Sequence, residues 1–463
     1  MKKIFLATLF LFISILNTNA QLSSAYTNRL QFVLDSVCNK FNIKGASAAL
    51  LVPNIGIWKG THGESYAGDP ITSDMLFGIG SNTKTHISAL MLRLQELGYV
   101  NISDTIGTWI QNQPNISGQI TIQQLLNHTS GLYSFTDTSV FWDSVFNDPA
   151  HVWQPEQALQ FVSTPYFAPG TSWHYSNTNY LLAGLIIKQI MGQPLSLSLQ
   201  NYLLTPVGLS NTIFFPEQNS SAPMPHIWST WFGAGNLEDV MATYGYSNNS
   251  LFSLAYGAGA IMQTAEDNAQ FWHKLISGQI IDTSSLNEMM QFIPIGISLG
   301  HPVGYGLGIF RYENFFSGHT IYEHGGTNMG FINENLIDSV TGTTISVLTN
   351  QDSINNDILF LDVVAALHKV SQQMSPTDIQ EILGTQMGIH IYPNPASGIL
   401  NVDIANNSAP IQLSLYDIVG RNIVNKEMTT SQKLDISRFT PGMYLLKMTS
   451  NGNMVYSATV RIN

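Results

Sequence analysis

The pattern of hydrophobic residues changes once along this 463-residue chain, and that change most limits what the chain can fold into. Up to about residue 371, segments with helical spacing alternate with strand-like runs. From residue 389 onward only short alternating strands occur, separated by Pro, Gly and Asn. This second pattern is typical of a small β-sandwich. The sequence therefore predicts a large mixed domain followed by a small all-β domain.

In the larger region, several segments place hydrophobic residues every three to four positions, as helices packed on one face do. We expect helices at 22–43, 81–97, 121–127, 155–163, 177–192, 264–277 and 357–371. Strand-like runs lie near both ends of the region, at 46–52, 56–60, 303–311, 318–323, 329–337 and 343–349. Strands at both ends with helices between them predict an α+β domain, in which helices flank one antiparallel sheet.

A long irregular stretch rich in aromatic residues lies inside this region, between residues 211 and 257. Irregular stretches of this length are uncommon in compact domains, where they often form lids or binding walls. We therefore expect residues 211–257 to border a site.

The composition excludes several classes of protein. Apolar residues make up 44% of the chain, enough for a large core, so global disorder is excluded. A net charge of −12 argues against nucleic acid and anionic membranes as partners. Residues 21–388 hold 10 basic and 26 acidic side chains, whereas residues 1–20 and 389–463 are each slightly basic. The single cysteine, Cys38, excludes a disulfide scaffold and a cysteine-based metal centre.

The first 20 residues have the pattern of an export signal. Lys2 and Lys3 precede an apolar run at 4–16, and the small residues Thr18 and Ala20 follow it. This run is too short to span the roughly 30 Å hydrocarbon core of a membrane. We therefore expect a signal peptide cleaved after Ala20, rather than a membrane anchor.

Ser81 and Lys84 lie three residues apart at the start of the predicted helix 81–97, so they share one helix face. At a helix N-terminus, free N–H groups and the helix dipole favour developing negative charge. A lysine one turn later can accept the serine's proton, or lower the cost of removing it, which activates the hydroxyl as a nucleophile. Chance supplies about one Ser-x-x-Lys in such a chain, so the pair alone would indicate only a solvated helix face.

Two further motifs follow this pair. Tyr175-Ser176-Asn177 precedes an apolar run, and His324-Gly325-Gly326-Thr327 adjoins a strand-like run. A tyrosine near a lysine can shuttle a proton, and an asparagine amide can hold a substrate carbonyl. The glycines would let a substrate approach the sheet edge closely. Taken singly, Tyr175 would be read as a core aromatic and His324 as a structural histidine.

Together the motifs SNTK, YSN and HGG, in this order, resemble those of the serine β-lactamases and penicillin-recognising DD-peptidases. The similarity lies with the branch that contains class C β-lactamases, DD-carboxypeptidases and related esterases. It covers roughly residues 30–370 and includes the stretches LLNHTSGL (125–132), FAPGTSWHYSNTNY (167–180) and YGLGIF (305–310). The resemblance implies a β-lactamase/transpeptidase-like fold with a helical subdomain, and an acyl-enzyme serine hydrolase of the β-lactam, D-alanyl-peptide or ester-cleaving type.

The resemblance also implies roles for the catalytic residues. Ser81 would be the acylated nucleophile, and Lys84 its proton acceptor or electrostatic activator. Tyr175 would pass the proton to the leaving group and then help to activate water. No cofactor is implied, and the twelve histidines show no metal-ligand spacing such as His-Glu-x-x-His.

Four further residues would bind the substrate. Asn177 would orient the substrate carbonyl, and His324 would support the proton network. Gly326 would allow close approach to the strand. The backbone N–H groups of Ser81 and Thr327 would form the oxyanion hole, in which one donor is typically worth about 10²–10³ in rate.

The third motif departs from the family pattern in one respect. Members that bind a carboxylate usually have Lys-Thr-Gly or His-Thr-Gly there, and Gly325 removes the middle hydroxyl. The acidic balance of this domain also gives a small anion no long-range attraction. An ester or a neutral amide is therefore as plausible a substrate as a cell-wall peptide.

The C-terminal region resembles a type IX secretion sorting domain, through IHIYPNPASGILNVDI (389–404), LYDIVGRNIV (415–424) and LDISRFTPGMYLLKM (434–448). The order of these motifs favours sorting over the alternative, a carbohydrate-binding β-sandwich. The resemblance implies type IX secretion machinery as a partner, and a secreted or cell-surface location.

These observations predict a signal peptide at 1–20, a hydrolase domain at 21–371, a linker at 372–388 and a sorting domain at 389–463. The partner of the hydrolase would be a small-molecule or peptide acyl substrate, with no nucleic acid, and the sequence leaves the oligomeric state open. A non-catalytic penicillin-recognising binding protein is the alternative from another class, although such a protein has no need of Lys84 and Tyr175 together.

Overall fold

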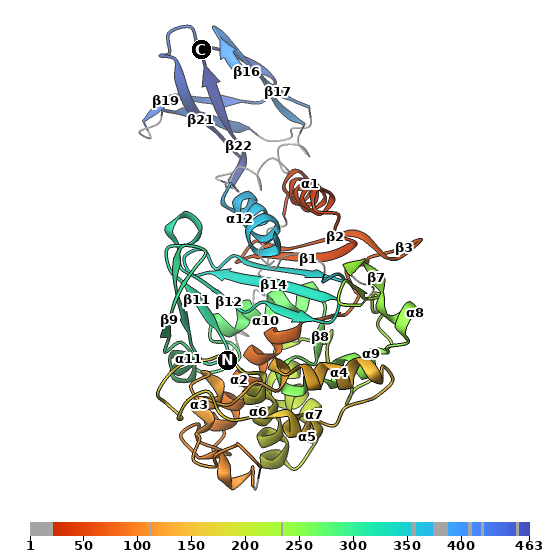
Figure 1. Ribbon diagram of the computed structural model, residues 1–463. Helices are drawn as coiled ribbons and strands as arrows, with labels where there is room; N and C mark the ends of the chain where they lie inside the picture. The colour runs from red at the N-terminus through yellow and green to blue at the C-terminus, as the bar shows by residue number, and fades with distance from the viewer. Residues whose placement is uncertain are drawn as a thin grey trace, which may run out of the picture. The chain divides into compact units, whose positions relative to one another are not determined.

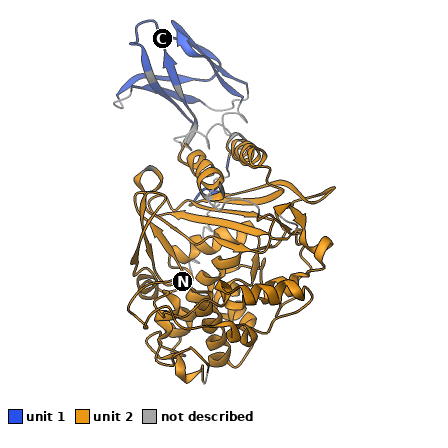
Figure 2. Ribbon diagram, in the orientation of Figure 1, with its two compact units in different colours: residues 1–22, 54–56, 379–463 blue, residues 23–53, 57–378 orange. Residues whose placement is uncertain are grey.

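The computed structural model describes residues 22–111, 113–232, 235–352, 358–373, 388–405, 410–417, 421–450 and 453–463. The chain forms two compact units (Figure 2). Residues 23–53 and 57–378 form the larger unit, and residues 1–22, 54–56 and 379–463 form the smaller one. The predicted signal peptide and most of the predicted linker lie outside the described residues.

A ten-stranded sheet crosses the larger unit in the order β3-β2-β1-β15-β14-β12-β11-β10-β9, with β13 paired to β14 (Figure 1). The strands pair in antiparallel orientation from β1 through β15 and β14 to β9, and β2 pairs with β3 in the same way. The strands are β1 Gly45–Val52, β2 Gly56–Tyr66, β3 Asp69–Pro70, β9 Ile293–Ser298, β10 His301–Tyr305, β11 Phe310–Tyr312, β12 Ile321–Glu323, β13 Gly326–Asn328, β14 Phe331–Asp338 and β15 Thr344–Thr349.

Helices cover both faces of this sheet (Figure 1). On one face α1 (Ser24–Lys40) packs against α12 (Ala365–Gln372), and on the other α10 (Ala265–Ile276) packs against β1 and β15. Every residue of β14 and β15 is buried. The α+β fold with an antiparallel sheet is therefore confirmed.

A helical subdomain lies beyond α10, and its helices pack around α2 and α6 (Figure 1). Both helices are buried along most of their length. α6 is largely apolar, whereas α2 also buries polar side chains, among them Lys84 and His86. The helices of this region and of the connecting segments are α2 Thr83–Glu96, α3 Ile122–Leu126, α4 Ser139–Asn147, α5 Pro155–Ala158, α6 Asn177–Met191, α7 Leu195–Leu199, α8 Val240–Tyr244, α9 Asn248–Ser253 and α11 Thr283–Met289.

Short strands complete the larger unit. β4 (Phe77–Gly78), β8 (Ile261–Gln263) and β5 (Thr212–Phe214) form a three-stranded sheet, and β6 (Trp228–Ser229) pairs with β7 (Glu238–Asp239). The stretch 211–257, expected to be irregular, therefore contains short strands and helices.

Two predicted elements differ from the structure. The single strand expected at 303–311 is a hairpin of β10 and β11, because Gly308 turns the chain with a φ of 71°. An added Cβ on Gly308 would lie 2.6 Å from Ser88 Oγ and 2.8 Å from Tyr180 OH, so this turn packs tightly against α2 and α6. The helix expected at 155–163 ends as α5 at Ala158, and a 3₁₀ turn follows it.

The smaller unit is a β domain with its own hydrophobic core. One group of strands is ordered β16-β17-β20 and the other β19-β18-β21-β22, and they join where Ala396 pairs with Ile462. The strands are β16 Ile389–Ser397, β17 Ile399–Ile404, β18 Ile411–Tyr416, β19 Asn422–Met428, β20 Gln432–Asp435, β21 Gly442–Ser450 and β22 Asn453–Ile462. The change of pattern at residue 389 thus marks a real change of fold.

Within the described ranges, no helix combines the length and the apolar character needed to cross a bilayer.

Candidate active site

Ser81 lies in the 3₁₀ turn Gly80–Asn82, directly before α2. This turn approaches β13 so closely that only glycines fit at the contact. An added Cβ on Gly80 would lie 2.7 Å from the carbonyl oxygen of Thr327, and one on Gly326 would lie 2.7 Å from the backbone nitrogen of Ser81. The fold therefore brings the first and third motifs together through their backbones.

The side-chain amide of Asn333 on β14 fixes this contact from the sheet side. Its Nδ2 donates to the carbonyl oxygen of Ile79 at 2.5 Å and to that of Gly326 at 2.9 Å. One buried amide thus ties the serine turn to the strand that faces it. The sequence motifs gave no indication of this residue.

Lys84 lies one helical turn after Ser81 and is fully buried. Its Nζ donates to Ser81 Oγ at 2.9 Å and to the carbonyl oxygen of Ala258 at 2.8 Å. Burial holds the pKa of Lys84 well below its usual value, because a low-dielectric environment disfavours the charged ammonium. A lysine in this state can act as a neutral base toward the serine.

Tyr175 is the second hydrogen-bonding partner of Ser81. Its ring centroid lies 5.0 Å from Lys84 Nζ, so the side chains of Ser81, Lys84 and Tyr175 lie close together. Burial raises the pKa of Tyr175 above its usual value, and the hydrogen bond to Ser81 offsets part of that rise. The phenol is therefore protonated at neutral pH and can give or relay a proton.

His324 is buried beside this group, with its ring centroid 6.2 Å from that of Tyr175. Its Nδ1 donates to the carbonyl oxygen of Gly325 at 2.8 Å, which leaves Nε2 to accept from Tyr305 OH at 3.1 Å. Burial, with a smaller contribution from the charge of Lys84, lowers the pKa of His324 to about 3. His324 is therefore neutral and brings no positive charge to the third motif.

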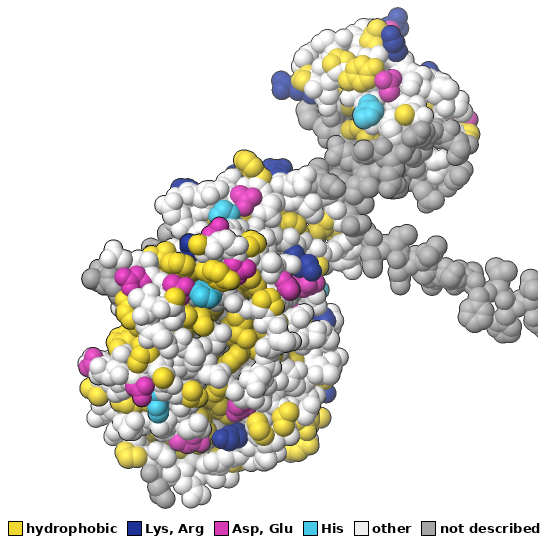
Figure 3. Space-filling view, turned by 90° about the vertical axis from the view of Figure 1, so that its right-hand side faces the viewer, with side chains coloured by type: hydrophobic (Ala, Val, Ile, Leu, Met, Phe, Trp, Pro, Cys, Tyr) yellow, Lys and Arg dark blue, Asp and Glu magenta, His cyan; other side chains and the backbone are white. Residues whose placement is uncertain are grey.

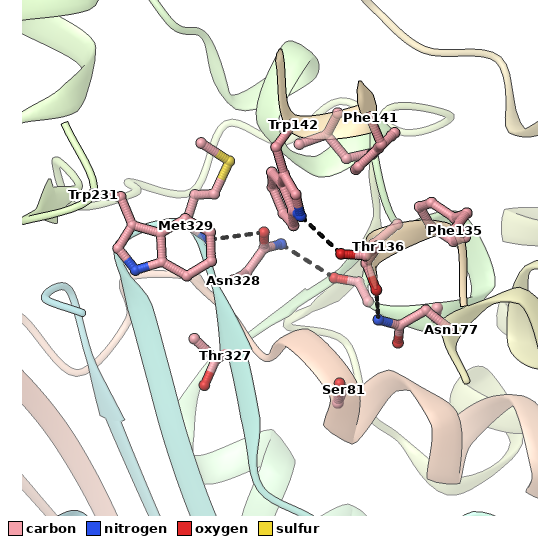
Figure 4. Close-up of a pocket in the computed structure, with 14 residues that line it drawn as sticks. Ser81, Phe135, Thr136, Phe141, Trp142, Asn177, Trp231, Thr327, Asn328 and Met329 are labelled. Carbon is pink, nitrogen blue, oxygen red and sulfur yellow. Dashed lines mark hydrogen bonds between the residues drawn. The ribbon is translucent and has the colours of Figure 1, made fainter. Parts of the chain in front are cut away.

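Asn177 is the first residue of α6, and the helix start fixes its orientation. Its backbone N–H donates to Ser134 Oγ at 3.2 Å, and its Nδ2 donates to Thr136 Oγ1 at 2.9 Å. Figure 4 shows Asn177 and Thr136 on one side of a pocket and Thr327 on the other, with Ser81 between them.

This pocket has a volume of about 350 Å³, within the range of small-molecule sites. Six large apolar or aromatic side chains supply much of its wall, and none of the described lining residues carries a charge. The lining residues are Ser81, Phe135, Thr136, Phe141, Trp142, Asn177, Trp231, Leu254, Ala255, Ala258, Gly259, Thr327, Asn328 and Met329. Trp231, Leu254 and Ala255 come from the stretch that we expected to border a site.

Aromatic side chains also form the rim of the pocket. Trp142 on α4 meets Trp231 edge to face at 5.3 Å and stacks on Phe146, and Trp231 is 51% exposed. Other hydrophobic side chains are exposed over one face of the larger unit (Figure 3). The exposed part of the pocket wall therefore includes aromatic surface from Trp231.

The sequence motifs missed a set of buried groups behind Tyr175. The hydroxyl of Tyr180 donates to the carbonyl oxygen of Leu126 at 2.7 Å and lies 2.8 Å from Ser88 Oγ. The ring centroid of His128 lies 4.3 Å from that of Tyr175. His128 and Tyr305 occur in the stretches LLNHTSGL and YGLGIF, so the signal that could have identified them was present.

The expected site residues thus divide into two groups. Ser81, Asn177 and Thr327 line the pocket. Of the others, Lys84, His324 and Gly326 are buried and Tyr175 is half-buried, and none of these four is among the described lining residues. Among the residues with described positions, no group of three or more His, Cys, Asp or Glu side chains could hold a metal ion.

This combination of a helix-covered antiparallel sheet and a serine–lysine pair beside the sheet edge is that of the β-lactamase/transpeptidase-like fold. The chain belongs to the β-lactamase family, because the model of that family matches residues 37–367. The model of the secretion system C-terminal sorting domain matches residues 390–463, which implies export to the cell surface or the medium. Both resemblances found in the sequence are therefore confirmed.

Relatives of similar sequence include proteins named as a penicillin-binding protein and as an esterase. The chain is 28% identical over 285 residues to "Putative penicillin-binding protein PbpX" of Bacillus subtilis (strain 168), covering 60% of this chain and 62% of that one. It is 26% identical over 214 residues to the esterase EstB of Burkholderia gladioli, covering 43% and 54%. The chain thus spans less than two thirds of the length of either relative.

Among solved structures, the D-stereospecific amidohydrolase from a Streptomyces species superimposes with a TM-score of 0.63 at 28% identity. The match covers 73% of this chain and 98% of that one. The fold of the larger unit therefore also occurs in a protein named as an amidohydrolase.

Proposed function

We propose that the protein is an exported serine hydrolase that cleaves amide or ester bonds through an acyl-enzyme on Ser81. The observation that carries this proposal is the hydrogen bonding of one serine hydroxyl to both a buried lysine and a half-buried tyrosine. A hydroxyl held in this way is prepared to lose its proton as it attacks. Membership of the β-lactamase family supports the same chemistry.

In the first half-reaction, Ser81 Oγ attacks the substrate carbonyl carbon and its proton passes to Lys84. The backbone N–H groups of Ser81 and Thr327, held together by the glycine contacts, stabilise the oxyanion. As the carbonyl re-forms, the bond to the leaving group breaks, and Tyr175 returns the proton to that group.

In the second half-reaction, water attacks the acyl carbon and Ser81 regains its proton. The water's proton passes through the hydroxyl of Tyr175, which gives its own proton to Lys84 as it accepts, and Lys84 returns a proton to Ser81 Oγ as the acyl bond breaks. Asn177 orients the substrate carbonyl, and Gly326 leaves room for it against β13. His324 supports the proton network through Tyr305, whose hydroxyl hydrogen-bonds to His324 Nε2.

The bond cleaved is of the β-lactam or D-alanyl-peptide type, or an ester bond if the protein is a carboxylesterase. The neutral state of His324 favours the ester, because a carboxylate-bearing substrate would find no cation there. A non-catalytic penicillin-recognising binding protein is the remaining candidate. It predicts acylation without turnover, or binding without acylation.

Export follows from the two ends of the chain. We propose that residues 1–20 direct passage through the inner membrane and are cleaved. Residues 389–463 then engage the type IX secretion machinery, and residues 372–388 link them to the hydrolase domain at 21–371. The match of residues 390–463 to the sorting-domain model supports this route.

A fluorophosphonate probe tests the nucleophile directly. The mature protein should gain one adduct on Ser81 and lose its esterase activity, and Ser81→Ala should abolish both the label and the turnover. Ser277→Ala, which removes an exposed hydroxyl after α10, is the matched control and should behave as the unchanged protein does. Full turnover by Ser81→Ala would overturn the proposal.

A further inference from the structure

Resting on the function proposed above, we propose that the enzyme selects acyl donors whose leaving group carries no carboxylate and whose acyl group is large and apolar. The key residue is Glu334 on β14, whose carboxyl group occupies the space beside Gly325. Glu334 thus acts as a specificity-determining residue for the leaving-group side of the site.

The leaving group must lie near Tyr175, which returns its proton. The third motif adjoins this position, since the rings of Tyr175 and His324 are 6.2 Å apart. The groups that the third motif presents therefore decide which leaving groups are tolerated. A carboxylate on the leaving group would need hydrogen-bond donors or a cation there.

The carboxyl oxygens of Glu334 lie beside Gly325, at the middle position of the third motif. An added Cβ on Gly325 would lie 2.5 Å from Glu334 Oε1 and 2.7 Å from Oε2, so no residue with a side chain fits there while Glu334 is in place. Glu334 is 8% exposed and is held within β14 between two neighbouring strands. The glycine at position 325 and the carboxyl group of Glu334 therefore depend on each other, because the carboxyl group occupies the space that a side chain at 325 would need.

A second carboxyl group holds the same glycine from its backbone. Glu323 Oε2 accepts from the N–H of Gly325 at 2.7 Å, and Glu323 also has a hydrogen bond with Tyr312. The Gly325 N–H is therefore occupied and cannot bind a substrate anion. Burial raises the pKa of Glu323 to about 8, so both Glu323 and His324 are neutral at pH 7 and the third motif presents no cation.

The acyl group lies on the other side of Ser81, in the aromatic pocket. Asn177 and Thr327 line this pocket, whereas Tyr175 and His324 are not among its described lining residues. Trp142, Trp231 and Met329 all line this pocket (Figure 4). The uncharged lining would bind an apolar acyl group and gives a charged one no partner.

Two esters of phenylacetic acid test the leaving-group preference. Their phenol carries either a carboxylate or a carboxamide at the same meta position, so the acyl group and the bond cleaved are identical. We expect kcat/KM to be at least about tenfold higher for the carboxamide. A ratio near one, or a preference for the carboxylate, would overturn the proposal.

Two isosteric variants locate the origin of the preference. Glu334→Gln should lower the ratio at least about threefold, because it replaces a carboxyl oxygen beside Gly325 with an amide that can donate a hydrogen bond. Asp362→Asn removes a carboxylate that pairs with exposed Lys40 and should leave the ratio unchanged. An equal fall in both variants would assign the preference to overall charge and overturn the role of Glu334.

The same assay separates this proposal from the proposed function. Turnover of both esters at equal rates, with fluorophosphonate labelling of Ser81, would overturn the specificity alone. No turnover of either ester and no labelling of Ser81 would overturn the hydrolase function, and the specificity with it.

Discussion

On one side of Ser81 lies a set of buried side chains joined by hydrogen bonds, and on the other lies an open pocket with an uncharged aromatic wall. The buried side consists of Lys84, Tyr305 and His324 with the half-buried Tyr175, and burial disfavours the charged form of each, lowering the pKa of Lys84 and His324 and raising that of both tyrosines. The pocket side relies on apolar contacts from α4 and from the loop around Trp231. The difference teaches that reactivity and substrate choice are properties of separate parts of the molecule.

If the comparison holds, changes on the buried side lower kcat and leave binding intact, whereas changes in the pocket raise KM and leave kcat intact.

Replacing Lys84 should have the largest effect. Lys84→Ala removes the only described cationic or basic side chain that contacts Ser81 Oγ, so kcat should fall about 10³–10⁴-fold, at the upper end of general-base effects. Steady-state kinetics with a phenyl ester measures the fall. Lys188→Ala, on the exposed side of α6, is the control and should retain full activity. Wild-type kcat in Lys84→Ala would remove the lysine from the mechanism.

Tyr175→Phe should follow, with kcat about 10²-fold lower and KM within about threefold of the wild-type value. The change deletes one hydroxyl and keeps the ring that packs on His128. Tyr166→Phe, which deletes a hydroxyl bound to Asp137 at the surface, provides the control and should change neither constant. A rise in KM with unchanged kcat would show that Tyr175 binds the substrate and does not take part in proton transfer.

Trp142→Ala should affect the pocket alone. It removes one aromatic wall, so KM for a phenylacetyl ester should rise about tenfold while kcat stays nearly constant. The acetyl ester, which does not reach this wall, should be cleaved as before. Phe32→Ala removes an exposed aromatic ring from α1 and serves as the control. Equal losses on both esters would show that Trp142 supports the fold rather than the substrate.

The pH profile gives the smallest but most specific effect. Lys84 must be neutral to accept a proton, so kcat/KM should fall as the pH drops through its lowered pKa. His324, with its pKa lowered to about 3, stays neutral over this range and should not contribute to the acidic limb. His324→Gln should therefore reduce the rate and keep the position of that limb. Loss of the limb in this variant would assign it to the histidine.

The sequence predicted the buried side better than the pocket side, and the reason is physical. Ser81 and Lys84 are adjacent in a helix, so their contact depends only on helical spacing. Tyr175 and His324 come from distant segments, and only the family resemblance placed them together. Trp142 and Trp231 carried no motif, because an apolar wall needs size and hydrophobicity rather than a particular residue at a fixed spacing.

The fold shows the same division. Long periodic segments such as α6 and α10 were predicted within a residue or two, because their burial follows from one strong pattern. The hairpin of β10 and β11 was predicted as one strand, since its turn depends on Gly308 fitting against Ser88 and Tyr180, a contact between distant segments. Glu334 beside Gly325 could not be foreseen for the same reason.

The most direct test of the acyl-enzyme account is the mass of the intact protein, quenched in acid within milliseconds of mixing with a phenylacetyl ester. The account predicts a transient gain of one phenylacetyl group that peptide mapping places on Ser81, and that decays as phenylacetate is released. Release of phenylacetate at full rate with no acylated Ser81 in the wild-type protein, and unchanged release by Ser81→Ala, would contradict it.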